Sequence, residues 1–323
     1  MTANPVASVQ ALGAAIESEV AKVVFGQGPL TRMVTIALLA GGHVLLEGPP
    51  GTAKTLLAQA FARATGLAFG RIQFTPDLMP GDILGSNLFN FQTSSFTLTK
   101  GPIFTELLLA DEINRTPPKT QAALLEAMQE RRVTINGEAH VMSPRFTVLA
   151  TQNPIEQQGV YPLPEAQLDR FMFLIELDYP SAAEEIRIAR ETTGSARQAL
   201  NRLIDGDKIL AFQQLVRRVP VPEHLYEYAV NIVRRTRPNQ PESPQWLKDT
   251  VGWGAGPRAV QYLILGAKSR AALRGSYMAS LEDLEAVASP VLTHRVITNF
   301  SAESQGMTSK KIVQRLIAEM REE

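Results

Sequence analysis

The chain has 323 residues, of which 45% are hydrophobic and 20% charged, a composition typical of a globular protein long enough for two domains. Its 32 Lys and Arg balance 32 Asp and Glu, so the formal net charge is zero and binding to nucleic acid chiefly through non-specific charge is disfavoured. Cysteine is absent, which excludes disulfides, thiolate catalysis and thiolate metal sites.

Neither a signal peptide nor a membrane span is expected. Residues 1–10 lack a basic segment followed by a long apolar run, and the longest apolar runs elsewhere are too short to cross a bilayer. We therefore expect a cytoplasmic protein.

Two helices and a strand are predicted ahead of the first glycine-rich loop. Apolar residues recur at helical spacing over 8–22 and over 30–40, and Gly41-Gly42 would end the second helix. The apolar segment 43–47 then indicates a short buried strand.

The run from Gly48 to Thr55 lies between that strand and a segment rich in helix-forming residues, 56–62. Strand, glycine-rich loop and helix in this order are typical of a phosphate-binding loop, because backbone N–H groups and the helix dipole then face a triphosphate. We expect Lys54 to reach the β- and γ-phosphates and the Thr55 hydroxyl to ligate Mg²⁺. The candidate nucleotide-binding residues here are Gly48, Pro49, Pro50, Gly51, Thr52, Ala53, Lys54, Thr55 and Leu56.

Ala53 stands where this loop pattern usually has glycine before the lysine. A Cβ is tolerable there if the dihedral angles are helical, and costly if φ must be positive. We interpret Ala53 as the start of the helix, which predicts helical dihedral angles. The alternative for the whole run, an ordinary Gly/Pro turn before a helix, is disfavoured by the flanking strand and helix.

Short strands continue to alternate with helices up to residue 175. Strands are predicted over 71–74, 104–110, 146–150 and 171–175, and a helix over 119–130. The stretch 76–100 is expected to hold a short helix and a hairpin, and Asn136-Gly137 indicates a second hairpin within 131–145. This alternation predicts an α/β fold with a parallel sheet and helices on both faces.

Beyond residue 180 the pattern changes, and helices only are predicted. They cover 182–192, 207–216, 222–236, 257–274, 281–292 and 309–323. We therefore expect two domains, a nucleotide-binding core over 1–180 and a smaller all-helical domain over 181–323.

An apolar strand ends in Asp111 and Glu112, 57 residues after Lys54. Ligands of open α/β sheets bind at the carboxyl ends of the strands, so these two acids are placed beside the phosphate loop. We expect Asp111 to hold the Mg²⁺ shell and Glu112 to orient or deprotonate the attacking water. An isolated Asp-Glu pair is usually a solvated turn. This pair is informative because of its separation in sequence from the predicted phosphate-binding loop.

Three further polar residues complete the candidate site. Asn153 ends another strand, and its amide could bond the γ-phosphate and the attacking water, although Asn-Pro after a strand is more often a turn. Arg170 offers a planar fork of donors for phosphate charge, and its alternative is a surface ion pair with Asp169 or Glu165. Arg258 sits in a first helical turn, where a cation opposes the dipole, so a functional role is favoured.

These elements occur in the order of the AAA+ ATPases, and in detail the chain resembles the MoxR family over residues 17–318. The matching runs are Gly48–Thr55 with its alanine before the lysine, Leu109–Gln121, Ala150–Pro154 and Leu163–Phe171. The resemblance implies a P-loop NTPase core followed by a helical lid, similar to the ATPase subunit of magnesium chelatase. The stretch near 76–100 would be the insertion in the second core helix, and 131–145 the hairpin before the Asn153 strand.

The resemblance also implies roles that spacing alone does not. Family members are expected to form hexameric rings with ATP between neighbouring subunits. Arg170 would be an arginine finger acting on the next subunit's nucleotide, Arg258 a sensor in the lid, and Arg115 a further residue facing that interface. The segment Val24, Phe25 and Gly26 matches the one that packs against adenine. Many members work beside a partner with a von Willebrand factor A domain and assemble or activate metal-cofactor enzymes and other complexes.

The leading hypothesis is a Mg²⁺-dependent ATPase that couples hydrolysis to remodelling of, or metal insertion into, a client protein. One alternative is a nucleic-acid motor such as a clamp loader, which the absence of a basic stripe disfavours. The other is a scaffold that binds ATP without useful turnover. Glu112, Asn153 and Arg170 weigh against it, because a pure binder needs none of them.

Overall fold

Five parallel strands form the central sheet of the computed structural model, which describes residues 5–90, 92, 94–154, 159–193 and 198–322. The strand order is β2-β5-β8-β1-β9, and every neighbouring pair is parallel. The predicted α/β class is therefore confirmed. The strands are β1 (Val44–Glu47), β2 (Phe69–Gln73), β5 (Leu107–Asp111), β8 (Thr147–Gln152) and β9 (Phe173–Glu176).

Alternate residues of the strands enter two hydrophobic clusters, one on each face of the sheet. Val44 and Leu46 of β1 pack in the cluster that includes α1 (Pro5–Val20), α2 (Gly28–Ala40) and α3 (Lys54–Thr65), whereas Leu45 packs in the cluster that includes α5 (Pro118–Glu130). This split follows from the period of two in a strand. Both faces are covered by helices, as the sequence predicts.

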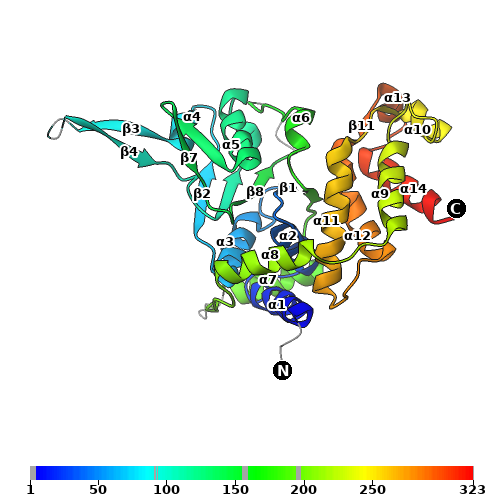
Figure 1. The fold of residues 1–323 in the computed structure, drawn as a ribbon, viewed down its shortest axis with the longest axis horizontal. Coiled ribbons are helices and arrows are strands. Elements are labelled where there is room, and N and C mark those ends of the chain that lie inside the picture. The colour runs from blue at the N-terminus through cyan, green and yellow to red at the C-terminus, as the bar shows by residue number, and fades with distance from the viewer. Residues whose placement is uncertain (1–4, 91, 93, 155–158, 194–197, 323) are drawn as a thin grey trace.

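Two β-hairpins extend from this core. Helix α4 (Pro80–Leu84) leads into β3 (Gly85–Asn90) and β4 (Ser95–Lys100), an antiparallel pair that projects at the upper left of Figure 1. The second hairpin pairs β6 (Arg132–Ile135) with β7 (Glu138–Val141). Asn136 and Gly137 turn it with φ of 50° and 86°, as a two-residue turn of this type requires. Both predicted hairpins are confirmed. The short elements η1 (Ile113–Arg115) and α6 (Glu165–Leu168) flank strands of the core.

The chain after residue 180 is mainly helical, but the expectation of helices only is incomplete. Strand β10 (Val251–Trp253) pairs antiparallel with β11 (Ile297–Thr298). Strands of three and two residues are too short to show an alternating pattern in sequence. The helices are α7 (Ala182–Thr193), α8 (Gly206–Arg217), α9 (Glu223–Arg235), α10 (Gln245–Thr250), α11 (Pro257–Leu273), α12 (Leu281–Leu292), η2 (Thr293–Arg295), α13 (Phe300–Ser304) and α14 (Ser309–Glu322).

These helices lie in two places (Figure 1). Helices α7 and α8 lie with α1 and α2 below the sheet, whereas α9 and α11 to α14 stand beside its β9 edge. The Gln213 side chain of α8 donates to the Leu38 carbonyl of α2 at 2.7 Å. Of the helices in the described ranges, none has both the length and the apolar character needed to cross a membrane.

Candidate functional site

The glycine-rich loop joins β1 to α3 at the carboxyl edge of the sheet (Figure 1). Gly48 packs closely against Leu177, the residue that follows β9. A Cβ on Gly48 would lie 2.7 Å from the Leu177 carbonyl oxygen. Thr52 Oγ1 donates to the Pro49 carbonyl at 2.9 Å and closes the loop on itself. No side chain among the described residues caps α3, so the N–H groups of its first turn are open to an anion.

Ala53 does not have the helical dihedral angles predicted from the sequence. Its φ is 60° and its ψ 22°, so it is the left-handed residue that precedes α3 rather than the first residue of the helix. The chain turns here so that the start of α3 faces the loop. A non-glycine residue in this conformation costs about 1 kcal/mol. The loop therefore carries backbone strain at the position where the general pattern has glycine.

Lys54 points its ammonium group into the loop. Its Nζ donates to the carbonyl oxygens of Gly48 and, at 3.1 Å, of Pro49. Burial lowers the pKa of Lys54, and the carboxylates of Asp111, Glu112 and Glu47 oppose that shift. A phosphate oxygen is a stronger acceptor for an ammonium group than a neutral carbonyl, so this lysine suits a triphosphate in the loop.

Asp111 is 8% exposed at the end of β5 and faces α3. Its Oδ2 lies 3.4 Å from Thr55 Oγ1 and 2.7 Å from Arg71 Nη2, and its Oδ1 accepts a hydrogen bond from Thr151 Oγ1 at 2.7 Å. The structure thus brings together the two residues predicted to ligate Mg²⁺. The Arg71 guanidinium supplies the positive charge beside the carboxylate.

Glu112 directly follows in a left-handed conformation, with φ of 57°. Gln73 Nε2 donates to its Oε2 at 2.8 Å, and Arg115 Nε lies 3.2 Å from the same oxygen. The backbone N–H of Glu112 donates to Thr151 Oγ1 at 2.9 Å. Two side chains therefore hold the Glu112 carboxylate, and the strained backbone of Glu112 fixes the point from which its side chain extends.

Asn153 follows β8, the strand next to β1, and is 7% exposed. The Gly48 N–H donates to the Gln152 carbonyl at 3.4 Å, which places Asn153 beside the start of the phosphate loop. Asn153 and Asn114 line a cavity of about 210 Å³. The strand that Asn153 follows is thus placed where the sequence predicts.

The segment Val24–Gly26 and the phosphate loop both lie against the short stretch of chain that follows β9. Glu184 of α7 packs against Gly26, where a Cβ would lie 2.1 Å from its Oε1, while Leu177, a few residues earlier, packs against Gly48. The Arg187 guanidinium lies 4.6 Å from the centroid of the Phe25 ring. Both nucleotide-binding candidates therefore flank residues 177–184.

Arg170 and Arg258 lie at the opposite, amino edge of the sheet. Arg258 Nη1 pairs with Asp169 Oδ2 at 2.7 Å, and both arginines line a cavity of about 250 Å³ with Gly41 and His43, which precede β1. Asp169 therefore does not pair with Arg170, contrary to one alternative considered for it. Arg170 is half-buried, and its Nε has no hydrogen-bond partner among the described residues.

Sequence reasoning missed three residues that hold the acids in place: Arg71, Gln73 and Thr151. Gln73 pairs in register with Asp111, and Arg71 shares its face of β2. Two polar residues at a spacing of two in a short strand are a signal for this arrangement. Thr151 occupies the matching position of β8, where a polar residue among buried apolar ones is the corresponding signal.

The donor set fits a magnesium–nucleotide complex. Within the described part of the chain, no group of three or more His, Cys, Asp or Glu side chains could hold a metal ion alone. Mg²⁺, however, prefers oxygen ligands and takes only one or two from protein when nucleotide phosphates are present. The Thr55 hydroxyl and the Asp111 carboxylate are oxygens of this kind, and the uncapped start of α3 lies beside them.

Comparison with known proteins agrees with this geometry. Residues 43–173 match the ATPase family associated with various cellular activities (AAA), and residues 246–316 match the AAA lid domain. The chain is 42% identical to Chaperone MoxR1 of Mycobacterium tuberculosis over 93% of its own length and 79% of that protein's. It is 31% identical to Protein MoxR of Methylorubrum extorquens over 88% and 87% of the two lengths.

A solved structure from Cytophaga hutchinsonii, assigned as an ATPase, superposes with a TM-score of 0.90 at 37% identity. The match covers 97% of this chain and 96% of that one. The family match and these relatives agree on the same enzyme class, ATP hydrolysis. The chain therefore belongs to the MoxR family of AAA+ ATPases.

Proposed function

We propose that this protein is a Mg²⁺-dependent ATPase whose active sites form between neighbouring copies in a closed ring. The single observation that supports this most strongly is the division of its charged groups between two edges of one sheet. Lys54, Thr55, Asp111 and Glu112 lie at the carboxyl edge, and Arg170 and Arg258 at the amino edge. A strand of four residues separates the edges by about 13 Å, which favours the two sets acting on different nucleotides.

Each residue then has a chemical task. Backbone N–H groups of Gly48–Thr55 and the Lys54 ammonium would bind the triphosphate, and Thr55 and Asp111 would hold Mg²⁺. The metal, when bound, would neutralise charge on the transferred phosphoryl group. Glu112 would orient and deprotonate the attacking water, and Asn153 would bond that water and the γ-phosphate. Val24, Phe25 and Gly26 would pack against adenine.

A neighbouring copy would supply the remaining positive charge. In a heterologous, head-to-tail interface the amino edge of one copy meets the carboxyl edge of the next, and such contacts close into a ring where the rotation between copies closes. Arg170 would stabilise the charge that develops in the transition state, and Arg258 would sense the nucleotide. Because Arg115 pairs with Glu112, it would report the state of the interface to the catalytic carboxylate.

The energy released would be used on another protein. The name of MoxR1 describes a chaperone, and we propose chaperone-like remodelling or metal-cofactor insertion in a client, beside a partner with a von Willebrand factor A domain. In this arrangement residues 1–180 are the nucleotide-binding core and residues 181–323 the lid. The protruding hairpin within 76–100 is the candidate surface for the partner or the client.

The test is ATP turnover per subunit, measured against protein concentration together with light scattering. Turnover should rise with concentration as copies associate. Glu112→Gln should abolish it, and Arg170→Ala should lower it by about 1000-fold, the effect typical of an arginine finger. Arg218→Ala, which removes an exposed arginine after α8, is the matched control and should keep wild-type activity. Constant turnover down to dilutions at which the protein is monomeric would refute the shared site.

A further inference from the structure

The lid contacts three successive backbone carbonyls of the segment that carries Arg170. Arg295 Nη2 donates to the carbonyl oxygens of Asp169 at 2.8 Å and of Phe171 at 2.7 Å. Between them, the Tyr262 hydroxyl donates to the Arg170 carbonyl at 3.2 Å. Tyr262 belongs to α11 and Arg295 to η2, so two lid elements bind one short stretch of the core.

The side chain of Asp169 strengthens this contact. Its Oδ1 accepts a hydrogen bond from Arg295 Nε at 2.7 Å, and its Oδ2 pairs with Arg258 Nη1 at 2.7 Å. Arg295 is only 5% exposed, and its guanidinium lies 5.2 Å from the centroid of the Tyr262 ring. A buried guanidinium is retained only where its hydrogen bonds are satisfied, so the position of this group is closely defined.

Within the described residues, the side chain of Arg170 has no anchor comparable to that of Arg295. Its Nε is buried without a hydrogen-bond partner among the described residues, and Asp169, its neighbour, is already paired with two lid arginines. The position of the Arg170 side chain is therefore set by the backbone from which it extends. That backbone is held by Tyr262 and Arg295.

We propose that Tyr262 and Arg295 are positioning residues for the arginine finger. They hold residues 169–171 to the lid, so that Arg170 is aimed at the neighbouring copy's nucleotide and moves whenever the lid moves. This proposal rests on the assignment of Arg170 as an arginine finger that acts between copies. It adds that the finger is controlled by the lid of its own chain, through contacts that involve no nucleotide.

The test exploits the fact that a defective finger harms a neighbour's site and leaves its own intact. Tyr262→Phe removes one hydrogen bond to Arg170 and keeps the ring. Arg295→Met removes the contacts to the Asp169 and Phe171 carbonyls together with the ion pair to Asp169. Misplacing a catalytic group by about 1 Å lowers the rate by up to about 100-fold, so kcat should fall in both variants and furthest in Arg295→Met. The KM for ATP should stay near that of the wild type, because the phosphate loop is untouched.

Each variant is then mixed with Glu112→Gln subunits, which have an inactive site but an intact finger. Random mixing in equal amounts makes about one quarter of the interfaces active, since each needs Glu112 on one side and a well-placed finger on the other. Activity should therefore rise above that of either protein alone for any variant whose own kcat has fallen by more than about threefold, and a smaller fall in both variants would itself count against the positioning role. A defect of overall lid folding would harm the variant's own nucleotide site and would not be rescued by mixing.

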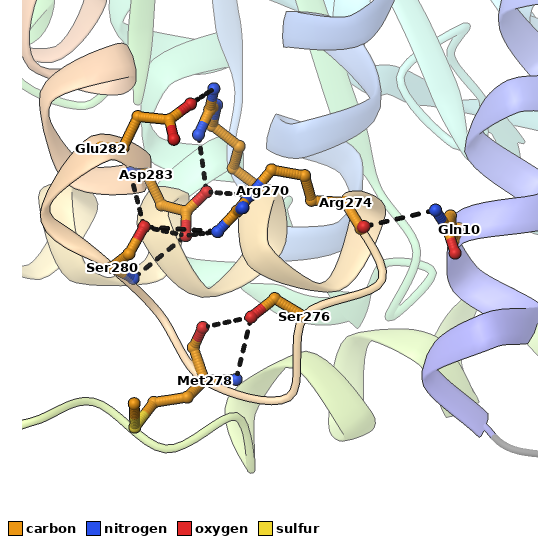
Figure 2. Close-up of polar contacts among 8 residues, drawn as sticks. All are labelled: Gln10, Arg270, Arg274, Ser276, Met278, Ser280, Glu282 and Asp283. Atoms are coloured by element: carbon orange, nitrogen blue, oxygen red, sulfur yellow. Dashed lines mark hydrogen bonds and ion pairs between the residues drawn. The ribbon is translucent and has the colours of Figure 1, made fainter.

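Figure 2 shows the matched control, an ion-pair network elsewhere in the lid. Arg270 Nη1 and Arg274 Nη2 pair with the buried carboxylate of Asp283 at 2.6 and 2.9 Å, joining α11 to α12 with no contact to residues 169–171 within the described part of the chain. Arg270→Met should lower thermal stability but keep kcat. If the Arg170→Ala and Glu112→Gln mixture gains activity whereas the Tyr262→Phe and Arg295→Met mixtures do not, the positioning role is wrong and the shared site stands. If the Arg170→Ala mixture also stays inactive, the shared site itself is wrong.

Discussion

Acidification below pH 7 should destabilise this protein because of a buried histidine. His43 is 5% exposed; its Nδ1 accepts from the Val148 N–H at 3.0 Å, and its Nε2 lies 3.2 Å from the Met128 carbonyl, to which it can donate. This arrangement requires a neutral ring. Burial lowers the pKa of His43 from 6.5 to about 4, and the nearby Arg131 acts in the same direction.

The sign follows from proton binding. Between pH 6.5 and 4 the unfolded chain binds a proton on His43 and the folded chain does not, so acid favours the unfolded state. From pH 7 to 5.5 the contribution of this one group to the free energy of unfolding falls by about 1.2 kcal/mol. Burial also lowers the pKa of His294, which adds a loss of the same sign.

Urea unfolding at about pH 7 and about pH 5.5 measures this loss for the wild type, His43→Gln and His224→Gln. His43→Gln should be less stable at pH 7 but should lose about 1.2 kcal/mol less on acidification than the wild type. His224 is exposed, so its replacement should leave the pH dependence unchanged. An equal loss in the wild type and in His43→Gln would refute the assignment of a neutral, buried ring.

Three further predictions concern the nucleotide site. Ala53→Gly should bind ATP and change the free energy of unfolding by at most about 1 kcal/mol, because relief of left-handed strain offsets the extra freedom of the unfolded chain. Ala53→Val, in contrast, should lower the melting temperature and weaken binding of a fluorescent ATP analogue. Thr151→Val removes the hydroxyl that donates to Asp111, so the Mg²⁺ concentration for half-maximal turnover should rise by about tenfold, and chelation of Mg²⁺ should abolish turnover in both proteins. Gln73→Ala removes one of the two donors to Glu112 Oε2, leaving Arg115, and should raise basal turnover by about fivefold, the factor that corresponds to one hydrogen bond of about 1 kcal/mol. An unchanged or lower rate would mean that Gln73 positions Glu112 productively.

Local pattern was enough to predict most of the core. The apolar strands β1, β5 and β8 precede Gly48, Glu112 and Asn153, and the carboxyl ends of parallel strands meet at one edge. For that reason Thr55 and Asp111, 56 residues apart, could be placed together without a structure. The turn chemistry of Asn136-Gly137 likewise determined a hairpin from two residues.

Features that depend on contacts distant in the chain could not be predicted in this way. Asp169 could be paired only with its neighbours in sequence, whereas its actual partners, Arg258 and Arg295, are 89 and 126 residues away. The left-handed φ of Ala53 was missed for a different reason. Alanine gives no local signal for positive φ, and the closure of the loop onto α3 imposes this conformation against the preference of the side chain.

The positions of the Arg170 segment, beside the lid, and of residues 177–184, beside the nucleotide loop, have a common consequence for how the protein could work. If the arginine finger were held by its own side chain, a lid movement would leave it in place, and the state of one nucleotide would be independent of the next copy's lid. Here the segment of Arg170 is bonded to Tyr262 and Arg295, while residues 177–184, which continue the chain after β9, pack against Gly48 and Gly26. The same strand, β9, therefore connects the lid-bound finger at one end to the nucleotide loop at the other. Under the proposed shared site, this single strand is the shortest covalent route by which one copy's nucleotide could influence the next.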